Sequence, residues 1–316
     1  MIVPRINNRT VHVRVPGTSA NCGPGFDCIG LACTVYNDLY LNLIEEPKLI
    51  IENTGEGADT IPTDETNAVW QSIRLLLERA GAADKYKGAV IRMENHIPIS
   101  RGLGSSAAAI VAGIKAANVI IDNHFNRQEL LRLATEIEGH PDNVAPALLG
   151  GITVSIVNNG DVQTLSFIPK MRLKVVIAVP DFPLSTKMAR QVLPKEVSMK
   201  DAVFNIGRAA MLIGALVKGK ERFLKNAFDD VLHQPYRTNL IPGMHEVFKA
   251  AKDAGALGAA LSGAGPCLIA FTLERDHVAT SVASSMAQAF LENGIKSRSL
   301  ILALDIRGAV VLNGEE

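Results

Sequence analysis

Apolar and polar residues alternate along several short stretches in the first half of the chain. The alternation over 11–15, over 34–44 and again near 47–53 and 88–94 predicts strands. A glycine-rich segment, residues 16–33, separates the first two of these and predicts an unusual loop. Apolar positions recur at helical spacing over 67–80, 105–121 and 127–138, which predicts three helices. The first half is therefore expected to mix strands and helices.

The second half repeats this mixture after a hairpin. The dipeptide Asn159-Gly160 predicts a two-residue turn between two strands. An apolar run over 173–180 predicts a buried strand, and we expect further helices near 200–217, 242–254 and 277–293 and strands over 267–272 and 298–304. We place the boundary near residue 165, which gives an N-terminal unit of 1–165, a C-terminal unit of 166–316 and an α+β fold class.

The composition is that of an ordinary globular protein. Of 316 residues, 47% are hydrophobic and 20% are charged, and 32 basic side chains balance 32 acidic ones. This balance indicates no nucleic-acid partner, and no run of about 18 apolar residues indicates a membrane span. The first residues lack the pattern of a secretory signal, so we expect a cytoplasmic protein. The 4 cysteines form no CxxC pair and the 7 histidines no HExxH motif, so we expect any metal to have oxygen ligands.

The segment PISRGLGSSAAA, residues 98–109, is the strongest candidate for an anion site. Its glycines let backbone N–H groups face an anion, and the helix that follows adds the positive end of its dipole. Ser105 or Ser106 can cap this helix, and both hydroxyls can reach a phosphate or a magnesium ion. The GxGxxA spacing also fits a dinucleotide turn, but Pro98 and Arg101 interrupt the strand that such a turn needs. A Walker loop is excluded because it requires a lysine, and close helix packing remains the structural alternative.

Three motifs in order along the chain resemble those of the GHMP kinases, a family that phosphorylates small molecules with ATP. The motifs are VPGTSANCGPGFDCIGLA (15–32), PISRGLGSSAA (98–108) and ALGAALSGAGPCLIAF (256–271). The resemblance implies a ribosomal protein S5 domain 2-like N-terminal domain followed by a ferredoxin-like C-terminal domain, with ATP bound between them. It also implies a homodimer.

The resemblance assigns the nucleotide and metal contacts to the first half. Asn67 matches the adenine-side asparagine of the family. The loop expected to surround the phosphates of ATP consists of Pro98, Ile99, Ser100, Arg101, Gly102, Leu103, Gly104, Ser105, Ser106, Ala107 and Ala108. Ser106 and Glu138 are the expected Mg²⁺ ligands, with Glu136 as a rival, since helical residues two apart point about 200° apart. Trp70 lies among apolar helix positions, so we expect it to pack rather than stack on a base.

Four local stretches resemble the members of the family that phosphorylate L-homoserine: TSANCGPGFD, EGHPDNVAP, FPLSTKMAR and HQPYR. The substrate residues that this implies are Asn21, Asp27, His140, Asp142, Asn143, Thr186, Arg190, Arg237 and, in the SGAGP segment, Gly263. Arginines can bind a carboxylate through paired donors, and carboxylate or amide oxygens can accept from an ammonium group. The residue types therefore suit a zwitterionic amino acid. We expect SGAGP (262–266) to line the substrate side with backbone donors, to form a tight turn that needs glycine, or both.

The expected reaction transfers the γ-phosphoryl group of ATP to the hydroxyl of homoserine. The candidate catalytic residues are Asp142, Asn143 and Arg190. In some relatives an aspartate after the metal glutamate acts as a base, and Asp142 occupies such a position; a loose transition state also allows catalysis by positioning alone. Two other interpretations stay open. One is another GHMP kinase, for mevalonate or phosphomevalonate, whose substrates carry no ammonium group, and the other is a non-catalytic metabolite sensor.

Overall fold

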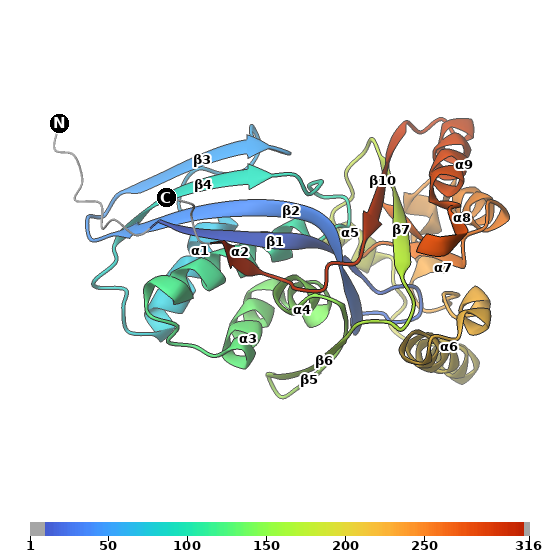
Figure 1. Ribbon diagram of the computed structural model, residues 1–316, viewed down its shortest axis with the longest axis horizontal. Coiled ribbons are helices and arrows are strands. Elements are labelled where there is room, and N and C mark those ends of the chain that lie inside the picture. Colours follow the sequence, from blue (N-terminus) through green and yellow to red (C-terminus); the bar gives the residue numbers. More distant parts are fainter. Residues whose placement is uncertain (1–9, 313–316) are drawn as a thin grey trace.

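The computed structural model describes residues 10–312, which form two sheets that lie next to each other (Figure 1). The first sheet has the strand order β11-β1-β2-β4-β3, and β5 pairs with β2 and with β6. Its strands are β1 (Val11–Ala20), β2 (Ile29–Ile44), β3 (Leu49–Gly55), β4 (Gly88–Asn95), β5 (Ile152–Asn158), β6 (Asp161–Phe167) and β11 (Val310–Leu312). All pairs in it are antiparallel except β3 with β4.

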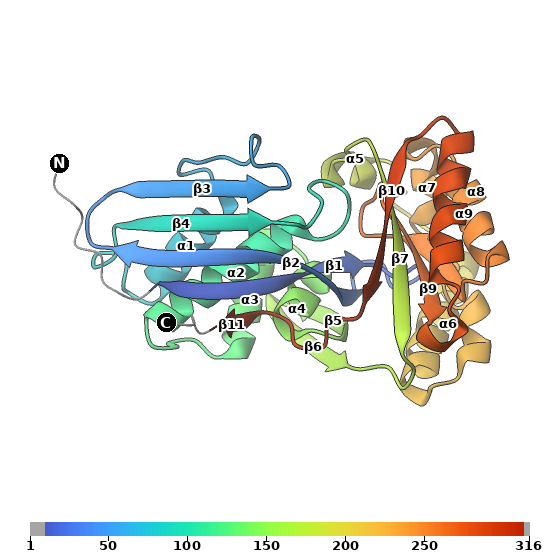
Figure 2. The ribbon, with the colours of Figure 1, turned by 45° about the horizontal axis from the view of Figure 1, so that its top comes forward.

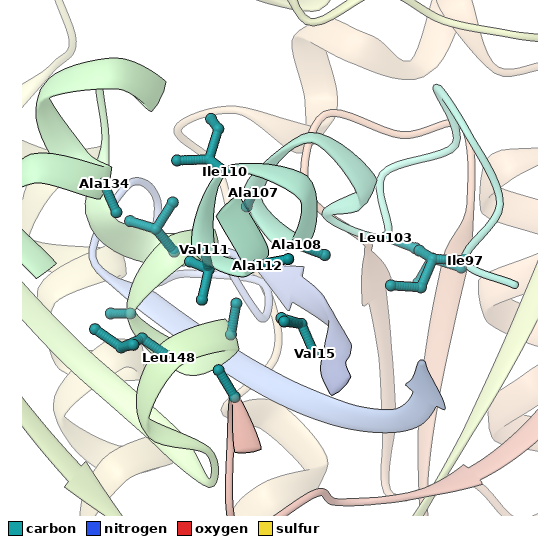
Figure 3. Close-up of a cluster of buried hydrophobic side chains, with 14 of the residues drawn as sticks. Val15, Ile97, Leu103, Ala107, Ala108, Ile110, Val111, Ala112, Ala134 and Leu148 are labelled. Atoms are coloured by element: carbon teal, nitrogen blue, oxygen red, sulfur yellow. The ribbon is translucent and has the colours of Figure 1, made fainter. Parts of the chain in front are cut away.

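Four helices cover one face of the first sheet (Figure 2). They are α1 (Ala68–Arg79), α2 (Ser105–Ile120), α3 (Arg127–Glu138) and α4 (Pro141–Leu149). Figure 3 shows why α2 can lie so close to the sheet: Ala107, Ala108 and Val111 face Val15 and Leu148, and all five side chains are buried. Small side chains let the backbone of α2 approach its neighbours, so the helix that follows the candidate phosphate loop is fixed in the core.

The second sheet has the strand order β10-β7-β9-β8 and is antiparallel throughout. Its strands are β7 (Leu173–Pro180), β8 (Gly258–Leu261), β9 (Leu268–Leu273) and β10 (Ser297–Ala303). The helices of this half are α5 (Thr186–Gln191), α6 (Met199–Lys218), α7 (Gln234–Arg237), α8 (Met244–Asp253) and α9 (Ala279–Glu292), with 3₁₀ turns η1 (Glu221–Asn226), η2 (Thr238–Leu240) and η3 (Glu274–Asp276). A strand, helices, two strands, a helix and a last strand in this order make the ferredoxin-like arrangement. The α+β prediction is confirmed.

The expected loop over 16–33 is much shorter in the structure. β1 runs on to Ala20 and β2 begins at Ile29, so only residues 21–28 are outside the strands. Both faces of the two strand ends are buried, which removes the alternation that marks a half-exposed strand. The short strands β8 and β11 also escaped prediction, whereas the hairpin turn at Asn159-Gly160 is confirmed, with φ of 50° and 79°.

The division at residue 165 stays a prediction. β6 runs to Phe167 in the first sheet, two residues past that boundary, and β11 brings residues 310–312 back to pair with β1. Segments from both ends of the chain therefore complete the first sheet. Within residues 10–312, none of the helices combines the length and the hydropathy needed to cross a bilayer.

Candidate active site

A cavity of about 470 Å³ is lined by both halves of the chain. Its lining includes all the predicted site residues except Ala107 and Ala108, namely Asn21, Asp27, Asn67, Pro98, Ile99, Ser100, Arg101, Gly102, Leu103, Gly104, Ser105, Ser106, Glu138, His140, Asp142, Asn143, Thr186, Arg190, Arg237 and Gly263. The side chains of Ala107 and Ala108 are fully buried in the core under α2, so they do not reach the cavity. Residues far apart in the sequence thus meet in one concave site of the size that ligand pockets have.

The loop before α2 has a backbone that only glycine adopts easily. Gly102 and Gly104 have φ of 81° and 67°. A Cβ on Gly102 would lie 2.1 Å from the carbonyl oxygen of Ser262, and a Cβ on Gly104 would lie 1.9 Å from Oγ1 of Thr18. Both glycines are therefore required for the conformation and for the close approach of neighbouring chain segments.

The start of α2 is open toward the cavity. Gly104 is the N-cap residue and no side chain caps the helix, so the expectation that Ser105 or Ser106 caps it is wrong. These serines are instead the first two helical residues and line the cavity. The uncapped N–H groups and the positive end of the dipole of a 16-residue helix favour an anion at this point.

The SGAGP segment holds this loop from the side of the second sheet. The Ser262 hydroxyl lies 2.6 Å from the carbonyl oxygen of Gly102, and the N–H of Cys267 donates to the carbonyl oxygen of Arg101 at 3.1 Å. The N–H of Gly263 donates to Ala20 in β1, and that of Gly265 to Ser262. Since these donors are used inside the protein, the segment lines the cavity as a tight turn with positive φ and does not offer those two N–H groups to a ligand.

Ser106 and Glu138 meet at the edge of the cavity. Oγ of Ser106 donates to Oε2 of Glu138 at 3.0 Å, and burial raises the pKa of Glu138 above its ordinary value. Glu136, two residues earlier on α3, points to the surface and forms an ion pair with Arg79 at 2.7 Å. Only Glu138 of the two glutamates lines the cavity, as the helical geometry predicts.

Ser106 and Glu138 suit an Mg²⁺ ion that is bound partly by the phosphates of a substrate, because two side chains alone cannot complete the coordination of a metal ion. Within residues 10–312 no group of three or more His, Cys, Asp or Glu side chains could hold a metal ion. Mg²⁺ commonly takes one or two protein oxygens, several waters and the phosphates of a substrate. A hydroxyl and a carboxylate next to an open helix start provide such a set.

The PDN segment, residues 141–143, forms the first turn of a helix. α4 begins at Pro141, where the missing N–H of proline costs no hydrogen bond. Nδ1 of His140 lies 2.6 Å from Oδ1 of Asp142, and this hydrogen bond raises the pKa of His140. Oδ1 of Asn143 accepts from the hydroxyl of Thr18 at 2.9 Å. The helix thus orients an acid and an amide side by side over the cavity.

Asp27 and Arg190 form a two-pronged ion pair inside the cavity. The guanidinium donates to both carboxylate oxygens, at 3.0 and 2.8 Å, and the pairing raises the pKa of Arg190. Asp27 has φ of 57°, and its N–H donates to Oδ1 of Asn21 at 3.0 Å, which fixes the turn. Both ionic side chains remain more than one third exposed, so a ligand can reach them.

Arg237 is the largest charged side chain among the buried residues of 10–312, with 2% of its surface exposed. It donates to the carbonyl oxygens of Ala189 and Gly263 at 3.1 and 3.2 Å, and lies 3.1 Å from Nδ1 of His233. No carboxylate in residues 10–312 forms an ion pair with it, and burial lowers its pKa to about 10. A buried cation without an anionic partner needs one from a ligand.

His233 supports Arg237 in its neutral form. Burial lowers its pKa, and its Nε2 donates to the carbonyl oxygen of Gly23 at 2.7 Å, which leaves Nδ1 to accept from the guanidinium. The ring of Phe26 stacks on His233 and lies 5.6 and 5.4 Å from the guanidinium carbons of Arg190 and Arg237. Phe26 is adjacent to Asp27 and His233 is four places before Arg237, so both lie in predicted stretches, but neither is predicted as a site residue from sequence.

The remaining predicted residues are also in place. Asn67 is the N-cap of α1: its Oδ1 accepts from the N–H groups of Val69 and Trp70, and its Nδ2 donates to Pro62 at 2.7 Å. Its role at the nucleotide stays a prediction. Trp70 is buried in the core, as expected. Thr186 begins α5 and lines the cavity.

Known proteins match this chain over nearly its full length. The family model described as GHMP kinases N terminal domain matches residues 67–151, and the model described as GHMP kinases C terminal matches residues 212–292. The chain is 44% identical over 303 residues to a homoserine kinase of Carboxydothermus hydrogenoformans, with 96% of this chain and 97% of that protein covered. It is 43% identical over 309 residues to a homoserine kinase of Clostridium botulinum, with 96% and 99% covered.

Solved structures give the same picture. A homoserine kinase from Cytophaga hutchinsonii superposes with a TM-score of 0.88 at 30% identity and covers 99% of this chain and 100% of its own. An L. major mevalonate kinase in complex with R-mevalonate superposes with a TM-score of 0.74 at 17% identity, with 98% of this chain and 99% of that chain covered. At that identity the second match shows the fold alone.

Proposed function

The chain belongs to the GHMP kinase family, and we propose that within it the chain transfers the γ-phosphoryl group of ATP to the hydroxyl of L-homoserine. The product is O-phospho-L-homoserine, an intermediate of threonine biosynthesis. The observation that carries the proposal is the full-length similarity to homoserine kinases together with a cavity that has both signs of charge. We further propose a cytoplasmic homodimer, which the sequence resemblance implies.

The charged groups of the cavity match the two ends of an amino acid. Arg237 lacks an anionic partner within residues 10–312, and Arg190 lies near it across the ring of Phe26. These guanidinium groups bind the carboxylate of homoserine. Asp27 and Asp142 receive its ammonium group. Charge-assisted hydrogen bonds of this kind are strong and directional, so they also orient the side-chain hydroxyl.

Residues 98–106, which are the loop before α2 and the first two residues of the helix, hold the phosphates of ATP in this proposal. The helix start has no side-chain cap, and Ser105 and Ser106, its first two residues, line the cavity. Ser106 and Glu138 are the side chains that would hold Mg²⁺, which neutralises phosphate charge when it is bound. Asn67 also lines the cavity, and we assign it to the adenine side of the nucleotide.

Positioning accounts for most of the catalysis in this proposal. Phosphoryl transfer passes through a loose transition state, in which the hydroxyl loses its proton late. Asp142 is held by His140 at 2.6 Å, and Asn143 by Thr18, so each keeps a fixed orientation toward the substrate. Asp142 serves mainly to grip the amino acid, and Arg190 stabilises the substrate carboxylate throughout the reaction. A dedicated base is not required.

A plate assay tests the proposal against its rivals. ADP release is measured with Mg²⁺ and ATP in the presence of L-homoserine, mevalonate, phosphomevalonate, galactose or L-threonine, and each product is identified by mass. Turnover of homoserine alone is the expected result. Turnover of mevalonate or its phosphate would keep the phosphate loop and overturn the amino-acid pocket. ATP binding without turnover of any substrate would identify a sensor.

A further inference from the structure

Part of the cavity wall carries no charge. This neutral wall comes from β2, the segments 61–62 and 66–69, and β4, and consists of Asn37, Ile61, Pro62, Thr66, Asn67, Ala68, Val69, Met93 and Asn95. The charged residues of the cavity, among them Asp27, Arg190 and Arg237, come from other segments. Apolar and amide side chains together suit a flat heterocycle, because its faces are apolar and its edge has hydrogen-bonding atoms.

Asn95 has an amide nitrogen without a partner in this neutral wall. It is the last residue of β4, which ends on the side of the first sheet that faces the second half of the chain (Figure 2), and it is 5% exposed. Its Nδ2 is buried and forms no hydrogen bond with any of residues 10–312. A buried donor without an acceptor is costly. Because Asn95 lines the cavity, a ligand can provide that acceptor.

The two other asparagines of the neutral wall already hold the backbone in place. Oδ1 of Asn37, on β2 directly opposite Asn95, accepts from the two backbone N–H groups that follow Asn95, at 2.8 and 3.0 Å. Oδ1 of Asn67 caps the first turn of α1, and its Nδ2 donates to the carbonyl oxygen of Pro62 at 2.7 Å. The resemblance assigns the adenine side to Asn67, yet that side chain is largely used inside the protein.

We infer that Nδ2 of Asn95 donates a hydrogen bond to a ring nitrogen of the adenine base of ATP, so that β4 recognises the base and the N-cap of α1 only shapes the site. The inference rests on the proposed use of ATP. Ring nitrogens of adenine are acceptors, and asparagine amides are frequent partners of this base. Ile61, Val69 and Met93 of the neutral wall suit the apolar faces of the base.

The backbone around Asn95 is fixed before any ligand binds. β4 lies between β2 and β3, and Asn95 is opposite Asn37 on one side and Gly55 on the other. The carbonyl oxygen of Asn95 accepts from the N–H of Glu56 at 2.8 Å. A strand end that is paired on both sides loses little conformational freedom when a ligand arrives. Asn95 therefore has the placement that base recognition needs.

Calorimetric titration with Mg²⁺ and ATP, without homoserine, measures the effect on nucleotide binding alone. Asn95→Leu keeps the branched shape of the side chain and removes the donor. The dissociation constant of ATP should therefore rise about 5- to 20-fold, because one acceptor of the base is left unsatisfied. The free variant should melt at the same or a higher temperature than the unsubstituted chain, since it loses an unpaired buried donor.

Asn37→Leu is the matched control for the melting temperature. It changes the same residue type on the neighbouring strand, but it leaves two backbone N–H groups without their acceptor. It should therefore melt at a lower temperature than the unsubstituted chain. A purely structural role of Asn95 would make the two variants behave alike.

Deaza analogues of ATP test the hydrogen bond itself. Each analogue replaces one ring nitrogen of adenine, N1, N3 or N7, with a C–H group that cannot accept. One of the three should bind the unsubstituted chain more weakly than ATP, by a factor similar to that of Asn95→Leu. Asn95→Leu should bind ATP and that analogue within about twofold of each other, because the donor and the acceptor act as one pair.

Three results would overturn the inference. Asn95→Leu could bind ATP as tightly as the unsubstituted chain does, or it could melt at a clearly lower temperature and still distinguish ATP from every analogue as the unsubstituted chain does. The unsubstituted chain could also bind all three analogues as tightly as ATP. Each of these leaves the proposed kinase activity intact, whereas a chain that binds no ATP would refute the activity together with the inference.

Discussion

Replacement of Arg190 by alanine separates substrate binding from folding. In the free protein the guanidinium pairs with Asp27 through hydrogen bonds of 3.0 and 2.8 Å, and the two side chains are 38% and 37% exposed. An ion pair this exposed contributes about 0–1 kcal/mol, so the free energy of unfolding should fall by no more than that. The substrate carboxylate, by contrast, loses a charge-assisted hydrogen bond of about 1.5–3 kcal/mol. This corresponds to a loss of roughly 10- to 150-fold in kcat/KM for homoserine.

Initial rates at varied homoserine with saturating ATP, and at varied ATP with saturating homoserine, give the two KM values. We expect KM for homoserine to rise strongly and KM for ATP to stay within about twofold, because the variant removes a carboxylate contact and no phosphate contact. Arg79→Ala is the matched control, since it also breaks an arginine–carboxylate pair, but at the surface. Equal losses for both substrates, or a large fall in the melting temperature, would refute the assignment of Arg190 to the substrate carboxylate.

Three further predictions concern the phosphate side and the pH dependence. Ser106→Ala should raise the Mg²⁺ concentration needed for half-maximal rate by about tenfold, the effect of losing one hydrogen-bond-strength contact, and an unchanged Mg²⁺ titration would remove Ser106 from the metal site. Gly104→Ala should lose ATP binding at least about tenfold in calorimetry, because φ of 67° and a contact of 1.9 Å both exclude a Cβ, and unaltered ATP affinity would contradict the role of this loop. The pKa of His140 is raised by Asp142, so their pair stabilises the folded state below pH 6.5 and loses that contribution as the pH rises through the raised pKa. Urea unfolding should therefore show His140→Asn to be destabilised by about 1.5–3 kcal/mol near pH 5.5 and by less near pH 8.5, and a pH-independent difference would exclude this linkage.

The parts of the site that could be predicted from the sequence are those that depend on residues close together in the chain. Gly102 and Gly104 predict a loop whose backbone can approach an anion, and the helical spacing of the apolar residues after them predicts α2. Helical geometry predicted that only one of Glu136 and Glu138 faces the site, the resemblance favoured Glu138, and in the structure only Glu138 lines the cavity. Local periodicity and local steric limits act over a few residues, so one sequence suffices to see them.

Contacts between distant residues could not be predicted in the same way. Asp27 and Arg190 were both expected at the substrate, but their pairing in the free protein spans 163 positions and depends on how the two halves meet. The neutral state of His233 depends on its complete burial, and the carbonyl oxygen of Gly23 determines which ring nitrogen carries the proton. The start of α4 had a local signal, Pro141 at the first helical position, that was overlooked.

The return of β11 to the first sheet bears on how the protein is made. The edge of β1 has hydrogen-bonding groups that pair with residues 310–312, so the first sheet is incomplete until the ribosome has passed Leu312. During synthesis that edge is open to strands of other chains, as is any unpaired edge. A fragment that ends after β6 contains the phosphate loop and the first four helices but lacks β11, which pairs with the edge of β1. Folding of the nucleotide-binding half is thereby tied to the completion of the half that follows it.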